Sequence, residues 1–175
     1  MKLAHNIWRD ERGTAVLEFG FLLPIMLTLF IGVIEATNVL RLDRKVVASA
    51  QTAADLVTQR REVSDAQLDD ILKAAELIFE PFPAASHSVG IAGVSFDPDT
   101  GDPTLDWTKS KNGGTVPNAL TLAAGLGEPG EGVVVVRVTY NYTPIFFDFV
   151  MGATTIEETA VLRPRRSSVV EGPGS

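Results

Sequence analysis

The chain has 175 residues and a formal net charge of −7, a length that allows one membrane segment and one modest domain. The sequence contains no cysteine, which excludes a disulfide framework and a cysteine nucleophile, and His5 and His87 lie on opposite sides of a long apolar run, which argues against a histidine-rich metal centre. Residues 1–45 carry six basic and five acidic side chains, whereas the remainder carries 9 basic and 17 acidic ones. Since the acidic part has no basic stripe, we expect no nucleic-acid partner.

The first element is a polar leader, residues 1–13, followed by an apolar segment over residues 14–40. Residues 17–36 would form about 30 Å of helix, which matches the hydrocarbon thickness of a bilayer. The only charges in the apolar segment, Glu18 and Glu35, lie near the two ends of this span, where a charge costs less than at the centre. We predict a transmembrane helix rather than the core helix of a soluble protein, because core helices seldom stay apolar on every face for this length.

The orientation of this helix is not set by the flanking charges. Three basic residues precede the span and three follow it closely, and they are Lys2, Arg9 and Arg12, then Arg41, Arg44 and Lys45. The positive-inside count is therefore tied.

Two helical pieces are expected over residues 41–83. Apolar residues at spacings of three and four extend the first helix beyond the span, and they are Leu42, Val46, Ala50, Ala53 and Val57. A second helix begins at the capping box SDAQ, in which the side chains of Ser64 and Gln67 each satisfy a backbone N–H. It ends before Pro81 and Pro83, because proline does not continue a helix.

Residues 84–166 are predicted to form a β domain. SVGIAGVSF and TLDWTKS flank the polar turn DPDTGDP, which indicates a hairpin, and VVVVRVTYNY alternates between an apolar and a polar face. A last strand lies in TTIEETAVLRPR, and the small, polar tail over residues 167–175 is expected to be disordered. The predicted fold class is α+β: a transmembrane helix continuing into a stem, a second amphipathic helix and a small antiparallel sheet of about four strands.

Three short patterns resemble binding or catalytic motifs. GLGEPG, residues 125–130, matches a dinucleotide fingerprint, but a proline interrupts it and a strand follows, so we expect a loop. Asp97 and Asp99 alternate as calcium ligands do; a hairpin turn is favoured, with calcium binding as the alternative. The serines beside His87 point to the other face of a strand and cannot pair with it. We therefore expect no catalytic residue, no metal site and no cofactor.

The segment IFFDFVMG, residues 145–152, concentrates three phenylalanines between two strands. Core packing is the favoured interpretation, because aromatic side chains are usually buried. An exposed contact patch for a partner is the alternative.

The stretch RGTAVLEFGFLLP, residues 12–24, resembles the processing and packing motif of the TadE-like minor pilins, or pseudopilins, of the tight-adherence (Flp/Tad) type IV pilus system. The likeness lies in a basic leader that ends at Gly13, the small Thr14, Glu18 as the fifth residue after the glycine, Phe19 beside it and Pro24 within the apolar run. ASAQTAADLV, VTYNY and the terminal RPR are also similar to that family.

The resemblance implies a non-enzymatic subunit of the bacterial inner membrane, with its leader in the cytoplasm and its C-terminal domain in the periplasm. A prepilin peptidase would cut between Gly13 and Thr14. Glu18, with Phe19, would then set the register by pairing with a neighbour's N-terminal amine, and Pro24 would kink the helix. Implied partners are the peptidase, the major pilin, other minor pilins and the pilus assembly platform.

The length of the chain separates it from the major pilins of this system, which end soon after the apolar helix. An accessory role in assembly or initiation of a pilus for adhesion follows, and incorporation into the extracellular fibre stays open. One alternative is an uncleaved, single-pass signal anchor that holds a periplasmic binding or envelope-scaffold domain. Another is a secreted protein whose signal peptide is cut after Ala36.

Overall fold

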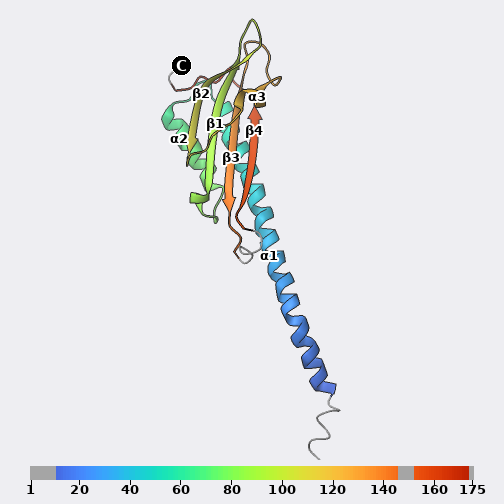
Figure 1. The fold of residues 1–175 in the computed structure, drawn as a ribbon. Coiled ribbons are helices and arrows are strands. Elements are labelled where there is room, and N and C mark those ends of the chain that lie inside the picture. Colours follow the sequence, from blue (N-terminus) through green and yellow to red (C-terminus); the bar gives the residue numbers. More distant parts are fainter. Residues whose placement is uncertain (1–10, 146–151, 174–175) are drawn as a thin grey trace, which may run out of the picture.

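A computed structural model of the chain describes residues 11–145 and 152–173. Two helices cover one face of a sheet, and the N-terminal part of the first extends far beyond the sheet (Figure 1). The elements in chain order are α1 (Glu11–Thr58), α2 (Asp65–Leu77), the 3₁₀ turn η2 (Ala84–Ser86), β1 (His87–Phe96), β2 (Pro103–Lys111), α3 (Ala119–Ala123), β3 (Gly132–Tyr142) and β4 (Thr154–Leu162).

Helix α1 is continuous over 48 residues, so the predicted continuation of the apolar helix into a stem is confirmed. Its two parts differ in burial. Residues 14–30 are exposed on every face, whereas the predicted apolar stripe is fully buried against the rest of the domain, and it consists of Leu42, Val46, Ala50, Ala53 and Val57. The change from exposed to buried begins between residues 31 and 42, where the helix reaches the sheet.

Helix α2 starts as predicted. The Ser64 hydroxyl accepts the Gln67 N–H at 3.3 Å, and the Gln67 side chain accepts the Ser64 N–H at 3.0 Å, which completes the capping box. At the other end, Lys45 of α1 donates to the carbonyls of Ile78 and Glu80 at 2.7 and 2.8 Å. These bonds satisfy carbonyls that a helix end leaves without partners, and they fix α2 against α1.

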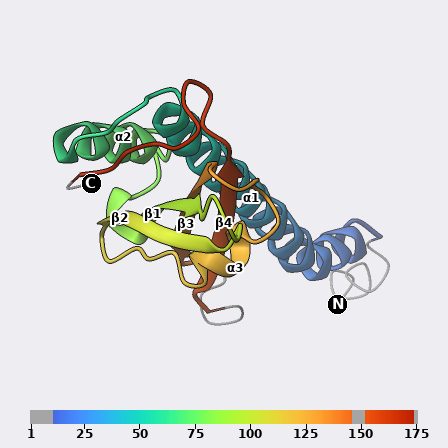
Figure 2. The same ribbon diagram turned by 90° about the horizontal axis from the view of Figure 1, so that it is seen from above.

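The sheet has the strand order β2-β1-β3-β4, and each neighbouring pair is antiparallel. The β1–β2 hairpin and the α+β fold class are therefore confirmed. The alternation predicted for β3 is also confirmed, because Val134, Val136, Val138, Tyr140 and Tyr142 are buried in the core shared with α1 and α2. Figure 2 shows both long helices on one side of the sheet and α3 on the other. There Ala119 and Ala123 cover a smaller cluster that includes Phe96.

The C-terminal tail differs from the prediction. Residues 167–173 are packed rather than disordered: Val170 is buried, and the Trp107 indole N–H donates to its carbonyl at 2.9 Å. The backbone of Glu171 pairs with Arg61 and Val63 at 3.0 and 2.9 Å. Composition misled the prediction, because one buried valine and these backbone bonds order a segment that is mostly small and polar.

Candidate assembly surface of the N-terminal helix

Most of the exposed large hydrophobic residues that the structure describes lie on α1, between Val16 and Leu40. Val16 is 71 % exposed and Phe21 is 77 % exposed, although both are large hydrophobic side chains. Among the described residues, α1 from Thr14 onward is the one helix long and apolar enough to cross a membrane. Apolar surface costs about 25 cal/mol per Å² in water, so a surface of this size requires lipid or neighbouring helices around it.

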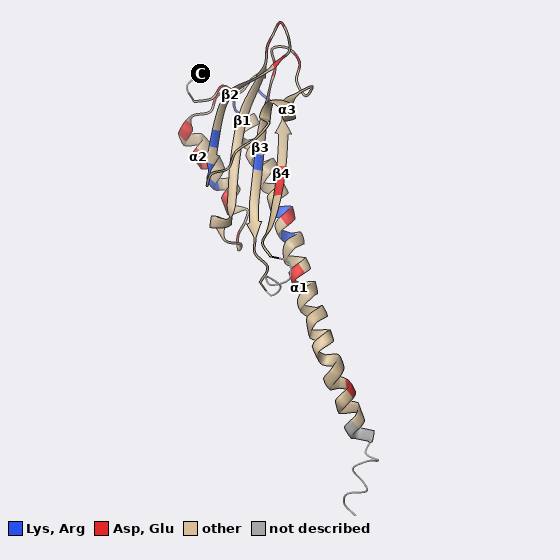
Figure 3. Ribbon diagram, viewed as in Figure 1, with Lys and Arg blue, Asp and Glu red and all other residues tan. Residues whose placement is uncertain are grey.

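Glu18 and Phe19 lie on this exposed surface. Within residues 11–145 and 152–173, we find neither a hydrogen bond nor an ion pair for Glu18. The carboxylate stands one turn from Thr14, because four residues of helix rise by about 6 Å. Figure 3 shows that the exposed apolar part of α1 carries few charged residues in comparison with the domain. The structure thus shows an exposed Glu18, and its pairing with a cation of another molecule stays a prediction.

The predicted cut site lies at the start of the same helix. The described part of α1 begins at Glu11, so the bond between Gly13 and Thr14 lies in the first turn that the structure describes. Cleavage of this bond stays a prediction.

Pro24 lies inside α1, and the helix continues on both sides of it. Proline has no N–H, so the carbonyl of Gly20 lacks its usual donor, four residues along the helix. In the next turn, the Thr28 hydroxyl donates to the Pro24 carbonyl at 2.8 Å. The kink at Pro24 stays a prediction.

Glu35, for which the sequence suggested no function, holds the stem to the sheet. Its side chain is buried at 3 % exposure, and its Oε1 accepts the Tyr142 hydroxyl and the Ile145 N–H, the latter at 3.1 Å. Burial, together with the hydrogen bond to Glu35, raises the pKa of the Tyr142 phenol above its ordinary value. The contact joins residues 107 positions apart, so no local pattern could have indicated it.

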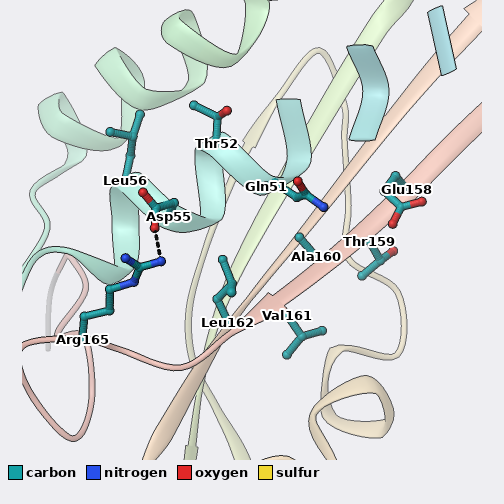
Figure 4. Close-up of a pocket in the computed structure, with 10 residues that line it drawn as sticks. All are labelled: Gln51, Thr52, Asp55, Leu56, Glu158, Thr159, Ala160, Val161, Leu162 and Arg165. Atoms are coloured by element: carbon teal, nitrogen blue, oxygen red, sulfur yellow. Dashed lines mark ion pairs between the residues drawn. The ribbon is translucent and has the colours of Figure 1, made fainter. Parts of the chain in front are cut away.

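A groove of about 540 Å³ lies between α1 and the outer edge of β4 (Figure 4). Its charged pair is Asp55 and Arg165, whose side chains are 2.6 Å apart. The lining residues of the groove are Gln51, Thr52, Asp55, Leu56, Glu158, Thr159, Ala160, Val161, Leu162 and Arg165. This set includes no serine, cysteine or histidine.

The turn between β1 and β2 is built by Asp97. Its carboxylate accepts the backbone N–H groups of Thr100 and Asp99, both at 2.9 Å, and these bonds lower the pKa of the Asp97 carboxyl. Across the described parts of the chain, no group of three or more acidic, histidine or cysteine side chains could hold a metal ion. The hairpin turn of the favoured interpretation is present, with the Asp97 carboxylate accepting its backbone N–H groups, while calcium binding stays untested.

The two remaining motifs also have structural roles. His87 is buried at 1 % exposure, stacks on Phe79 at 5.2 Å and bonds through Nδ1 to the Ala84 carbonyl. The glycine-rich segment 125–130 precedes β3, with no helix after it to receive a phosphate, so it is a loop as predicted. Residues 146–151, which contain the three phenylalanines, lie outside the described residues, and the interpretation of that segment stays untested.

The comparisons with known proteins match the front of the chain. Residues 13–55, about a quarter of the sequence, match the protein family described as TadE-like protein. No curated protein and no solved structure matches the chain significantly. The matched segment comprises the exposed apolar part of α1 and most of its buried stem. The match confirms the resemblance seen in RGTAVLEFGFLLP and supports a part for this chain in the Tad pilus system.

Proposed function

We propose that this chain, whose residues 13–55 are TadE-like, is a non-enzymatic minor pilin that takes part in assembly or initiation of a Tad/Flp-type surface pilus. The observation that carries the proposal is the coincidence of this match with an apolar helix that the domain leaves uncovered. Such a helix has two roles in a minor pilin. It holds the precursor in the membrane, and it later packs against other subunits.

Maturation by a prepilin peptidase between Gly13 and Thr14 is the first step of this proposal. Glycine suits the position before the cut, because it has no side chain to clash in a narrow protease site. The family match begins at Gly13, which supports a functional boundary near this residue. The cut creates a new cation, the α-amine of Thr14.

Pairing between this amine and a carboxylate is the second step. The Glu18 of one subunit binds the N-terminal amine of a neighbour, and Phe19 packs beside the pair. Insertion scales assign about 3 kcal/mol to a charge at the centre of a membrane helix, so even a fraction of this cost favours pairing over two separate charges in lipid. The carboxylate and the amine meet at only one axial offset between the two subunits, so the pair sets the axial register.

The proposed location follows from the same scheme. The leader lies in the cytoplasm, α1 crosses the inner membrane and the domain lies in the periplasm. The partners are the peptidase, the major pilin, other minor pilins and the assembly platform.

The maturation step is tested by the mass of the chain recovered from cells that contain the peptidase. We expect wild type to begin at Thr14, and Gly13→Leu to keep its leader because a side chain now occupies the protease site. Gly20→Ala is the matched control: it changes a glycine of the same helix at which an added Cβ meets nothing within 4 Å. A wild-type chain that begins at Met1 would contradict the cut and favour the uncleaved anchor.

A signal peptide cut after Ala36 conflicts with the arrangement of the domain. Such a cut would divide α1 and remove Glu35, whose carboxylate accepts hydrogen bonds from Tyr142 and Ile145. Recovery of a soluble chain that begins at Thr37 would favour this alternative over the proposal.

A further inference from the structure

The described loops at the two ends of the sheet differ in charge. At the end remote from the exposed part of α1, the β1–β2 turn and the loop before β3 carry five acidic residues, namely Asp97, Asp99, Asp102, Glu128 and Glu131. At the opposite end, the described residues of the β3–β4 connection, 141–145 and 152–156, carry no charged side chain. Figure 3 shows this contrast between the acidic loops at the top and the uncharged strand ends beside α1. Below, "the β3–β4 end" means residues 141–145 and 152–156.

The β3–β4 end lies at the level of α1 where the predicted membrane span stops. Glu35 is next to the last residue of the span, residue 36, and it accepts the Ile145 N–H at 3.1 Å. A backbone group bonded to this carboxylate must lie within a few ångströms of the same depth. The structure therefore places Ile145 at the boundary between hydrocarbon and headgroups if α1 spans the membrane.

The side chains at this level suit such a boundary. Ile145 is 67 % exposed, which is unusual for a large aliphatic residue beside a buried hydrogen-bond network. Tyr142 is buried and does not face lipid itself, but its hydroxyl donates to Glu35 and so holds this end of the sheet against α1. Arg41 and Arg44 are exposed on α1 about 9 Å or more beyond Glu35, a distance at which long basic side chains reach lipid phosphates.

We infer that the β3–β4 end is a second membrane contact, in which Ile145 enters the lipid interface and the Glu35–Tyr142 bond fixes its depth. The inference rests on the proposed membrane span of α1. The acidic end of the sheet then points away from the anionic lipid surface, which would repel it. The occupant of this surface is bilayer lipid, and the inference is drawn from the described residues alone.

Spin-label depth measurements test the contact directly. The natural chain has no cysteine, so single substitutions give unique labelling sites in the full-length protein, reconstituted into phosphatidylcholine vesicles. Three positions are labelled: Ile145→Cys, Leu27→Cys within the span and Leu105→Cys on β2. Leu105 is the matched control, because it is also a large, exposed aliphatic residue but lies near the acidic end of the sheet. Collisions with oxygen, which concentrates in lipid, and with a water-soluble nickel complex report the environment of each label.

We expect oxygen collisions to exceed nickel collisions at positions 27 and 145, and the reverse at position 105. Tyr142→Phe combined with Ile145→Cys should shift the balance at position 145 towards nickel, because it removes one bond that fixes the depth. A label at position 145 that behaves like the one at position 105, while position 27 reports lipid, would overturn this inference and leave the membrane span intact. A label at position 27 that reports water would overturn the span itself.

Discussion

Glu18 and Glu35 are the two carboxylates of the apolar half of α1, and they lie in opposite environments. Glu18 is exposed on a helix that the domain does not touch, whereas Glu35 is buried and accepts two hydrogen bonds from the β3–β4 end. Each lies near one end of the same predicted span. The difference shows that two carboxylates of one apolar helix can have opposite surroundings: Glu35 accepts hydrogen bonds within its own chain, whereas the proposed partner of Glu18 is another molecule.

Replacing Glu18 should give the largest effect. We expect Glu18→Ala to abolish or strongly reduce piliation, because the neighbour's amine loses its carboxylate. The free energy of unfolding of the domain should stay unchanged, since no contact with the domain is lost. Electron microscopy of cells and urea unfolding of the purified chain measure the two effects. Normal piliation in this variant would contradict amine pairing.

Replacing Glu35 should have the reverse pattern. Glu35→Ala removes the acceptor of the buried Tyr142 hydroxyl and of the partly buried Ile145 N–H, and a buried donor left unsatisfied costs about 1–3 kcal/mol. We therefore expect about 3 kcal/mol of destabilisation in urea unfolding followed by near-UV circular dichroism, with unchanged membrane insertion. Glu18→Ala is the matched control in this assay. Equal stability of the two variants would remove the distinction between the glutamates.

Alkaline pH should weaken the Glu35 site through Tyr142. The pKa of this phenol is raised in the folded chain, so its contribution to stability is complete below the ordinary value of 10 and is lost as the pH rises above it. For one such group the slope approaches about 1.4 kcal/mol per pH unit. Between pH 9 and about pH 12, the free energy of unfolding should fall less steeply in Tyr142→Phe than in wild type. Tyr140, whose pKa is also raised by burial, contributes equally to both chains.

At neutral pH, Tyr142→Phe should have the smallest effect of the series. The phenyl ring keeps its packing and only the hydroxyl is lost, so we expect about 1 kcal/mol of destabilisation. Glu35 retains the Ile145 N–H as a donor in this variant. If this variant lost as much stability as Glu35→Ala, the Tyr142 bond alone, rather than both bonds to Glu35, would hold α1 to the sheet.

Most elements of the fold were predictable because their signals are local. Two of these signals repeat every few residues: the stripe from Leu42 to Val57 and the alternation of β3. The third, the capping box at Ser64, lies within a single helical turn. The ordered tail and the role of Glu35 were missed, because both depend on partners distant in sequence: Trp107 for Val170, and Tyr142 for Glu35. The short helix α3 was also missed, since its five residues follow a glycine-rich loop and carry no cap.

The candidate site also has a part that the local sequence predicts and a part that depends on a distant partner. Gly13, Thr14, Glu18, Phe19 and Pro24 were named from a contiguous motif, and the family match covers all of them. Their proposed roles depend on a second molecule, which neither the sequence nor the fold of a single chain contains. The structure contributes the exposure of Glu18 and the burial of Glu35, and this contrast makes the roles testable.

The measurement that tests the account most directly is zero-length crosslinking of assembled subunits with a membrane-permeable carbodiimide, which joins an amine to a carboxylate in contact with it. We expect mass spectrometry to identify a peptide in which Glu18 is linked to the N-terminal α-amine of a neighbouring subunit, while Glu35 stays unlinked. A Glu18 that remains unlinked in assembled pili, or a link through Glu35 instead, would contradict the account.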